Sequence, residues 1–312
     1  MSTVVQQAPA FSPTPSQIAV AYSVCRSIAR SSAKNFYYAF LALPQAKRQA
    51  LCAIYAFMRR CDDITDDASL PLRDRRQKLA EWLDAVHRAF LMHPTDDPVL
   101  IALTDTQQRY KIAPELLDQL AYGTAMDVLE SDGDSRTGVS APQVQYRTFE
   151  DLRVYCYRVA SVVGLICIRV FGYRDSAAEP LAENLGLALQ LTNIIRDVKE
   201  DAVMGRIYLP QEDLEKFDVS PSELHSDGDS ARLRLLLASV ADRAREYYRS
   251  ADELILLVDE DSQPALWVLV TIYSRLLEKI AARQYDVFKQ KVTLSTREKL
   301  LILGKGLLKR LG

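Results

Sequence analysis

Apolar residues recur at spacings of three and four positions along most of this chain, and no other feature constrains its fold as strongly. This spacing gathers apolar side chains on one face of a helix. Glycine and proline, which interrupt regular structure, number only 11 and 13 among 312 residues. The pattern predicts an all-α chain, and the hydrophobic content of 48% is enough for a large buried core.

The spacing predicts eleven helices. The clearest start is that of the last one, because Ser295 and Glu298 match a capping box ahead of Leu300 and Leu301. The predicted ranges are 16–34, 43–67, 71–91, 99–110, 114–130, 149–171, 177–204, 211–216, 230–259, 264–290 and 295–311.

Residues 1–16, with three prolines among small and polar residues, predict a disordered tail, and residues 17–312 predict one helical domain. The peptide Ser-Asp-Gly-Asp-Ser occurs at 131–135 and at 226–230. Neither copy has the closing glutamate of a calcium loop, so both are interpreted as turns. The apolar runs are shorter than the roughly 20 residues that span a bilayer, so we expect a cytoplasmic protein that does not cross the membrane.

Charge and cysteine content exclude two classes of function. The formal net charge is −2, so a nucleic-acid surface built on bulk positive charge is not expected, and any anion site must be local. The five cysteines form no Cys-x-x-Cys pair and only three histidines are present, so the spacing of zinc ligands is absent. Reduced cysteines fit a cytoplasmic chain.

An acidic segment ends the apolar helix predicted over 43–67. Asp62 and Asp66 lie four residues apart, as do Asp63 and Asp67, so each pair shares a helix face. Like charges at this spacing destabilise a helix by roughly 0.2–0.5 kcal/mol for each pair. Either the segment is a solvated helix end, or a cation compensates for the repulsion.

A second acidic stripe lies in the helix predicted over 177–204. Asn193, Asp197 and Asp201 step by four, and Gln190 lies one turn earlier on nearly the same face. Ile194, Ile195 and Val198 lie beside the stripe, which indicates that it faces the interior. Buried carboxylates that face each other require cations, and hard oxygen ligands suit Mg²⁺, which completes its shell with water and substrate phosphates.

Three arginines accompany the acidic residues. Arg59, Arg196 and Arg206 lie within one to five residues of them, where a guanidinium could bind diphosphate oxygens in a bidentate manner. The alternative role is ion pairing with the nearby aspartates. Two acidic stripes and these arginines together predict a site that holds a diphosphate through metal ions.

The sequence resembles the squalene and phytoene synthase family, the head-to-head prenyl-diphosphate synthases. Three blocks carry the resemblance, which extends over roughly residues 18–305. The most specific block begins at Leu185, includes Gln190, Asn193, Arg196, Asp197 and Asp201, and ends with Arg-Ile-Tyr-Leu-Pro at 206–210. The others are Asn-Phe-Tyr-Tyr-Ala-Phe-Leu-Ala-Leu-Pro at 35–44, running on to Asp67, and Tyr-Cys-Tyr-Arg-Val-Ala-Ser-Val-Val-Gly at 155–164.

The resemblance implies a single α-helical isoprenoid-synthase domain with a central apolar cavity. It implies that Asp62 and Asp66 form the first metal motif, and that Asn193, Asp197 and Asp201 form the second, with Mg²⁺ as the ion and Mn²⁺ as an alternative. The reaction it implies joins two allylic prenyl diphosphates through a cyclopropylcarbinyl diphosphate. Mg²⁺ draws the diphosphate away from the donor, and the double bond of the acceptor attacks the allylic cation.

The resemblance also assigns roles outside the metal motifs. Tyr155 matches a tyrosine for proton removal or cation stabilisation. Lys34 and Asn35 match a phosphate-contacting segment, although serine is common where Ala33 and Asn35 stand. Lys291 stands where the family usually has arginine, with Tyr273 as its expected partner. The remaining substrate-binding candidates are Tyr55, Arg59, Gln190, Arg196 and Arg206.

The carbocation of such a reaction requires a dry cavity. Tyr37, Phe40, Tyr55, Phe57 and Tyr155 could line it, since an aromatic face stabilises a desolvated cation by about 2 kcal/mol; core packing is the alternative role for each. Ala160 and Gly164 place small side chains one turn apart, which would leave room for a prenyl chain or allow close helix packing.

The product is expected to derive from farnesyl diphosphate, giving presqualene diphosphate and squalene as in hopanoid pathways, with NADPH needed only for squalene. The alternative is condensation of geranylgeranyl diphosphate to 15-cis-phytoene, as in carotenoid biosynthesis. A chain-elongating synthase is less favoured because it would have a second Asp-Asp-x-x-Asp motif, and a terpene cyclase because it would have hydroxyl and glutamate side chains where Asp197 and Asp201 stand. A non-catalytic helical protein is less favoured because all the metal-motif positions are intact. The expected partners are prenyl diphosphates and the membrane surface, with no nucleic acid; the oligomeric state is left open.

Overall fold

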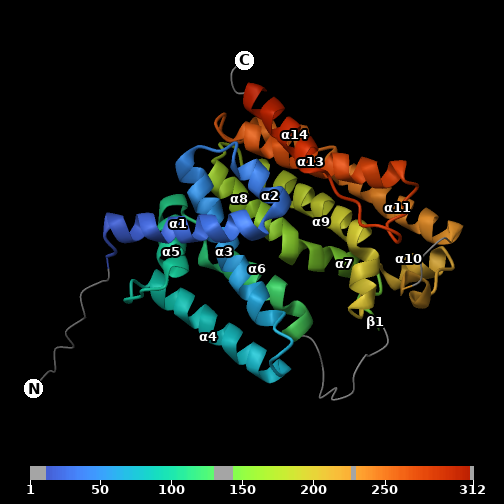
Figure 1. Ribbon diagram of the computed structural model, residues 1–312, viewed down its shortest axis with the longest axis horizontal. Helices are drawn as coiled ribbons and strands as arrows, with labels where there is room; N and C mark the ends of the chain where they lie inside the picture. The colour runs from blue at the N-terminus through green and yellow to red at the C-terminus, as the bar shows by residue number, and fades with distance from the viewer. Residues whose placement is uncertain (1–11, 130–142, 226–229, 310–312) are drawn as a thin grey trace, which may run out of the picture. The chain divides into compact units, whose positions relative to one another are not determined.

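The computed structural model describes residues 12–129, 143–225 and 230–309, and these are almost entirely helical (Figure 1). They divide into two compact units. Unit 1 comprises Met1–Lys34 and Gln45–Glu130, and unit 2 comprises Asn35–Pro44 and Ser131–Gly312. Residues 1–11 of the predicted tail, the peptide at 131–135 and most of its second copy lie outside the described residues, and the first helix begins at Pro15.

Unit 1 is built around helix α3, which packs against the four other helices of the unit. Its apolar face is buried, with Leu51 at 2% and Phe57 at 0% exposure. Thr14 and Gln17 form a capping box that starts α1, and Asp97 caps α5 by accepting bonds from the amides of Val99 and Leu100. The helices are α1 (Pro15–Ser32), α3 (Gln45–Thr65), α4 (Leu72–Phe90), α5 (Pro98–Tyr110) and α6 (Pro114–Leu129).

Unit 2 surrounds the long helix α9, which is buried on most of its faces and packs against helices on several sides. Two short parallel strands pair Gln143 with Arg206 and Val144 with Ile207. The elements are α2 (Lys34–Phe40), β1 (Gln143–Val144), α7 (Phe149–Cys156), the π-helical turn η1 (Tyr157–Ser161), α8 (Val162–Phe171), α9 (Ala178–Val203), β2 (Arg206–Ile207), α10 (Gln211–Lys216), the 3₁₀ turn η2 (Pro221–His225), α11 (Ala231–Tyr248), α12 (Ala251–Leu257), α13 (Gln263–Ala282) and α14 (Thr296–Lys309).

Two glycines bring the α7–η1–α8 segment against α9 at backbone distance. A Cβ atom on Gly186 would lie 2.6 Å from Cα of Ser161 and 2.7 Å from the carbonyl oxygen of Ala160, and one on Gly164 would lie 2.7 Å from the carbonyl oxygen of Ala182. The small residues at 160 and 164 therefore serve helix packing. The expectation that they leave room for a prenyl chain is wrong for Gly164, because the backbone of α9 fills that space.

The predicted helices are confirmed in position, with differences at three places. The stretch 149–171 contains a π-helical turn, and 230–259 is interrupted between Tyr248 and Ala251. The helix predicted over 264–290 ends at Ala282, because Gln284 and Tyr285 adopt positive φ and the following segment buries Val287 and Phe288 instead. Helix α2 and the two strands were not predicted.

The predicted capping box at the start of α14 is confirmed. The backbone N–H of Ser295 donates to Oε2 of Glu298 at 2.6 Å, and the backbone N–H of Glu298 donates to Oγ of Ser295 at 3.2 Å. Two otherwise unpaired amide groups at the helix start are thereby satisfied.

The stretch Phe149–Phe171 is more apolar than the sequence expectation allowed. It is long enough to cross a membrane, and an 18-residue window within it has a mean hydropathy of 1.7 and is half buried inside the protein. The core helix of a globular protein can have the same length and composition, so these two properties are weak support for a membrane span.

Candidate functional site

The first acidic pair lies at the end of α3 in unit 1. The amide of Asp66 donates to the carbonyl oxygen of Asp62 at 2.8 Å, so the helical geometry continues past Thr65 and keeps the two carboxylates on one face. Burial, and then the negative charge of Asp66, raise the pKa of Asp62 to about 7, and Arg59 offsets only part of this. A buried carboxylate with too little positive charge around it is suited to bind a cation.

Arg59 forms an ion pair with Asp63, 2.5 Å away, and both side chains are about half exposed. This pair lies on the neighbouring stripe of α3 and leaves Asp62 without a direct guanidinium partner among the ion pairs of the described residues. Tyr55 lies one turn before Arg59, is half-buried and interacts with it electrostatically. Arg59 therefore takes the ion-pairing role in this structure, at a position from which its exposed guanidinium can reach an anion.

The second motif lies on α9 in unit 2, and its predicted orientation is confirmed by burial. Ile194, Ile195 and Val198 beside the stripe are 2%, 0% and 5% exposed. Nδ2 of Asn193 lies 3.4 Å from Oε1 of Gln190, so the two amides contact each other along the stripe. Oδ1 of Asn193 is buried without a hydrogen-bond partner. An acceptor left in this state costs free energy unless a donor or a cation binds it.

Asp197 is held by two cations. Nε of Arg196 donates to Oδ1 of Asp197 at 2.8 Å, and Nζ of Lys291 lies 2.8 Å from the same oxygen. Lys291 also pairs with Glu200, one turn along α9. Burial alone would raise the pKa of Asp197, but the hydrogen bonds and charges of Arg196 and Lys291 outweigh it and lower that pKa.

Asp201 lies in a different electrostatic environment, one turn beyond Asp197. Burial, and then the charge of Asp197, raise its pKa to about 7, while Arg206 opposes the shift. Arg206 belongs to β2, and its pairing with Gln143 of β1 fixes the backbone that carries its guanidinium towards α9. Asp201 is therefore the member of the second motif with the least compensated charge.

Tyr273 joins three elements of unit 2. It lies on α13, is 3% exposed, and accepts hydrogen bonds from the side-chain amides of Asn35 on α2 and Asn193 on α9. Its ring also contacts Phe36 at a centroid distance of 5.7 Å. The expected pairing of Tyr273 with Lys291 is wrong: Lys291 bonds to Asp197 and Glu200 instead. The side chain of Lys34 lies outside the described residues.

Tyr155 lies in a cluster of three tyrosines. Its ring is 5.1 Å from that of Tyr208 and 5.4 Å from that of Tyr146, between centroids, and it is 8% exposed. Tyr208 follows β2 and Tyr146 follows β1, so the two-stranded pairing assembles the cluster. Tyr146 was missed from the sequence, because only the pairing of two very short strands places it beside Tyr155.

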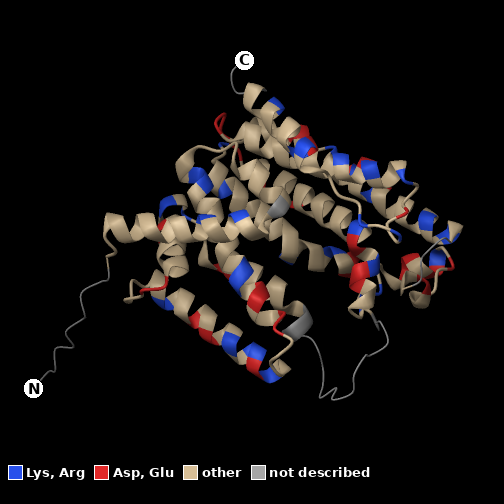
Figure 2. Cartoon of the chain, in the orientation of Figure 1, with Lys and Arg blue, Asp and Glu red and all other residues tan. Residues whose placement is uncertain are grey.

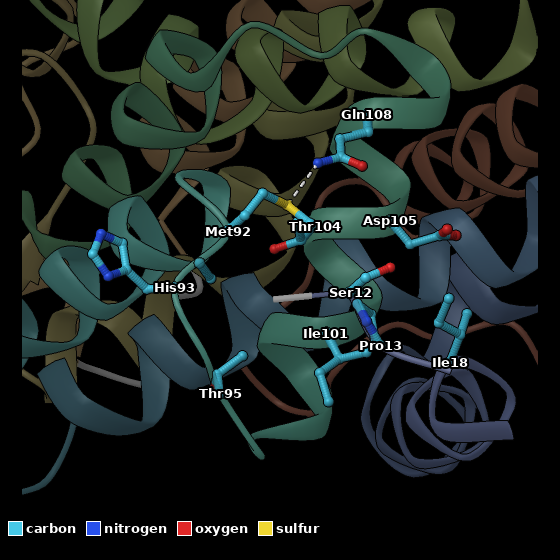
Figure 3. A pocket seen from close by; sticks show the side chains of 11 residues that line it. Ser12, Pro13, Ile18, Met92, His93, Thr95, Ile101, Thr104, Asp105 and Gln108 are labelled. Atoms are coloured by element: carbon cyan, nitrogen blue, oxygen red, sulfur yellow. Dashed lines mark hydrogen bonds between the residues drawn. The ribbon is translucent and has the colours of Figure 1, made fainter. Parts of the chain in front are cut away.

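Phe40 and Phe57, two of the aromatic residues expected to line a cavity, serve core packing. Phe57 is fully buried and stacks on Trp82 in unit 1, and Phe40 is 6% exposed. A cavity of about 210 Å³ does lie in unit 1, beside the start of α1 (Figure 3). Asp105 and Gln108 of α5 and His93 line it, but no predicted site residue does.

The donor atoms of each motif suit a divalent cation. Within the described ranges, no three His, Cys, Asp or Glu side chains are grouped closely enough to hold a metal ion by themselves. Mg²⁺ does not require such a cage, because it is usually bound by one or two carboxylates and completed by water and substrate phosphates. Two carboxylates with raised pKa and the unsatisfied Oδ1 of Asn193 are oxygen ligands of this kind.

Comparison with known proteins identifies the family of this chain. The sequence model of the squalene/phytoene synthases matches residues 29–298. The chain belongs to the squalene/phytoene synthase family. It is 36% identical over 303 residues to a 15-cis-phytoene synthase of Synechococcus elongatus, covering 93% of each chain. It is 36% identical over 298 residues to a phytoene synthase of Mycobacterium bovis, covering 93% of this chain and 92% of the relative.

A solved dehydrosqualene synthase shares the fold of this family member, with a TM-score of 0.79 and 31% identity, covering 95% of this chain and 98% of the other. The resemblance stated from the sequence and the predicted all-α isoprenoid-synthase fold are therefore confirmed. As a member of the squalene/phytoene synthase family, the protein is a prenyltransferase that condenses prenyl diphosphates head to head.

Proposed function

We propose that this protein condenses two molecules of geranylgeranyl diphosphate to 15-cis-phytoene. The observation that carries the proposal is the 36% identity to phytoene synthases over nearly the whole of both chains. These relatives therefore favour geranylgeranyl diphosphate, the alternative substrate, over farnesyl diphosphate, the substrate expected from the sequence. The described site supports the same chemistry, since it offers oxygen ligands for metal ions and cations for diphosphate.

The proposed reaction has two steps. In the first, the C1–O bond of one substrate breaks, C1 bonds to the double bond of the other, and loss of a proton closes a cyclopropane ring. In the second, the remaining diphosphate leaves, the carbon skeleton rearranges, and loss of a second proton forms the central double bond. No reductant is consumed, whereas squalene formation would need hydride from NADPH at the last step.

The metal-binding residues would be Asp62 and Asp66 in unit 1, and Asn193, Asp197 and Asp201 in unit 2. Mg²⁺, when bound, would neutralise the charge that develops on the departing diphosphate. Mn²⁺ has similar preferences for oxygen ligands and is expected to substitute for it. Asn193 contributes an oxygen that has no other partner, so its ligand role costs no existing hydrogen bond.

The cations of the site would bind the diphosphate directly. Arg196 and Lys291 both contact Asp197, and Arg206 lies close enough to Asp201 to oppose the rise of its pKa. A guanidinium can bind two phosphate oxygens at once, whereas Lys291 acts as a point charge. These side chains would hold the leaving group in place and stabilise its charge as the C1–O bond breaks.

Tyr155 would act on the hydrocarbon part of the substrate. Its ring is buried against two others, which is the dry aromatic environment that a carbocation requires. Its hydroxyl group is the candidate for accepting or relaying the proton lost in ring closure. The variant Tyr155→Phe separates these roles, because it keeps the ring and removes the hydroxyl group.

The proposal is tested by incubating the purified protein with geranylgeranyl diphosphate and Mg²⁺, with and without NADPH, and in parallel with farnesyl diphosphate. We expect phytoene from the C20 substrate, independent of NADPH, with two diphosphates released per product. Squalene or dehydrosqualene from farnesyl diphosphate as the dominant product would overturn the choice of substrate. Product formation unaffected by a metal chelator would overturn the role of the acidic motifs.

A further inference from the structure

Helix α14 uses one face to pack against α13. Ile302 and Leu303 are buried, and Gly306 lies so close to α13 that a Cβ atom there would be 2.4 Å from Cγ2 of Val268. Lys279 of α13 forms an ion pair with Glu298 at 3.1 Å. These contacts fix the rotation of α14 about its axis and decide which side chains point outward.

The outward face of α14 is apolar. Leu300, Leu301, Leu307 and Leu308 are 52%, 57%, 39% and 67% exposed. At 100° per residue, Leu301 and Leu308 fall on the side of the helix opposite Ile302 and Gly306, and Leu300 and Leu307 fall on the flank beside Leu303. Elsewhere in the described chain, large exposed apolar residues occur in the sequence singly or as one neighbouring pair, so this group is unusual for its surface.

Positive charge accompanies these leucines. Arg297 and Lys305 lie on the same outward face and are exposed, and a Cβ atom added at Gly304 would meet nothing within 4 Å. The acidic residue of the helix, Glu298, is turned towards Lys279. In Figure 2 the ribbon of α14 carries both blue and red segments. Because the carboxylate of Glu298 is paired with Lys279, the outward residues defined below are leucines and cations.

We infer that this face, defined as Arg297, Leu300, Leu301, Lys305, Leu307 and Leu308, docks the enzyme on a bilayer that contains anionic lipids. Leucines that enter the boundary between headgroups and acyl chains, flanked by cations that contact lipid phosphates, are the features by which a helix binds in the plane of a membrane. The inference rests on the family's prenyl-diphosphate chemistry, not on the length of the substrate. Such substrates are amphiphiles and their coupled products are hydrocarbons, so both partition into membranes.

The charge pattern favours a membrane over a protein partner. If this face packed against the same face of a second copy, Arg297 and Lys305 would lie opposite the cations or the leucines of that copy. Such a dimer would bring like charges together and would supply no negative charge. A partner helix would require its own acidic rim, whereas an anionic headgroup layer supplies negative charge at every position. The leucines and cations act together, since neither group alone gives stable binding of a short helix.

The test is co-sedimentation of the full chain with vesicles of phosphatidylcholine, with or without phosphatidylglycerol. We expect binding to the anionic vesicles that weakens in high salt. The double variant Leu301→Gln/Leu308→Gln should bind at least tenfold more weakly, and Arg297→Gln/Lys305→Gln about fivefold more weakly per charge removed. The matched control is Leu235→Gln/Leu256→Gln, which removes two leucines that are 61% and 74% exposed on α11 and α12.

Circular dichroism and diphosphate release from detergent-dispersed substrate should be unchanged in all these variants, because the face is separate from the metal motifs. Absence of wild-type binding to anionic vesicles would overturn the inference. So would equal losses from the α14 and control variants, or concentration-dependent dimerisation in solution that the α14 leucine variant abolishes. None of these outcomes would affect the proposed product, which is measured separately.

Discussion

Nζ of Lys291 lies 2.8 Å from Oδ1 of Asp197, at a carboxylate where a divalent cation is expected. The lysine reaches it from the segment that follows α13, and Arg196 contacts the same oxygen from within α9. The second motif therefore contains its own cations before any metal binds. A metal ion must compete with Lys291 for Asp197, and a diphosphate would give the displaced ammonium group a new partner.

Replacing Lys291 with glutamine should have opposite effects on the affinity for metal ions and the affinity for substrate. Removing a positive charge a few ångströms from the metal ligands should tighten binding of Mn²⁺ or Mg²⁺ to the substrate-free protein by about fivefold, a change of order 1 kcal/mol for a partly screened charge. The same variant should raise KM for the prenyl diphosphate. Calorimetric titration and steady-state kinetics measure the two effects.

Lys289→Gln is the matched control for this variant, because Lys289 lies two residues away and pairs with Asp286 instead. It should change neither the metal affinity nor KM. Weaker metal binding in Lys291→Gln than in the wild type would contradict competition and would assign Lys291 a supporting role in metal binding.

Replacing one aspartate with alanine in the metal-free protein should change the free energy of unfolding in opposite directions for the two metal motifs. Asp62→Ala removes a buried carboxylate repelled by Asp66, so the free energy of unfolding, measured in urea with EDTA, should rise by about 1 kcal/mol. Asp197→Ala leaves Arg196 and Lys291 without their shared partner, and should cost about 2–3 kcal/mol. Turnover should fall at least about a hundredfold in both. Loss of stability in both variants would contradict this view of Asp62.

Asp62 and Asp201 should make the metal-free protein less stable as pH rises. Their ordinary pKa is 3.8, and in the folded state each is raised to about 7 by burial and a neighbouring aspartate. Between these values the folded state holds a proton that the unfolded state has released. Each group's contribution to the free energy of unfolding therefore decreases from pH 4 to about pH 7 and is constant above it.

The measurement is the melting temperature across this range in EDTA, for the wild type and for Asp62→Asn/Asp201→Asn. The difference between the two proteins isolates these carboxyl groups from the other titrations of the chain. The variant's advantage should grow with pH and should disappear when Mg²⁺ is added to the wild type. A constant difference across the range would show that the two groups titrate normally.

Much of the fold could be predicted from spacing alone. The helices, the burial of Ile194, Ile195 and Val198, and the capping box of Ser295 and Glu298 follow from local periodicity and end signals, which the sequence contains directly. The end of α13 could not be predicted. Val287 and Phe288 continue an apolar pattern, and only tertiary contacts, such as the bond from Lys199 to the carbonyl oxygen of Phe288, hold them in a non-helical segment.

The acidic positions of the candidate site stand out in the sequence, whereas the contacts that surround them do not. The steps of four in Asp62/Asp66 and Asn193/Asp197/Asp201 marked the acidic faces. The contacts of Lys291 with Asp197, of Tyr273 with Asn35, and of Tyr146 with Tyr155 join segments far apart in the chain. No periodicity reports such contacts, because they depend on how the helices pack.

The contact between Gly186 and η1 should be indispensable to unit 2. Alanine at 186 would place its Cβ against the backbone of Ala160 and Ser161, which cannot move aside as a flexible side chain could, so we expect a loss of about 3 kcal/mol in urea unfolding. Gly304→Ala is the control, because a Cβ atom added there would have nothing within 4 Å. Alanine is also a better helix former than glycine, so this variant should stabilise α14 by about 0.5–1 kcal/mol. Because η1 directly follows the helix that carries Tyr155, Gly186→Ala should also lower kcat while the folded fraction is held constant, and Gly304→Ala should not. Equal stability of Gly186→Ala and the wild type would show that α9 and η1 can separate without cost, and the backbone contact would then not be what positions Tyr155.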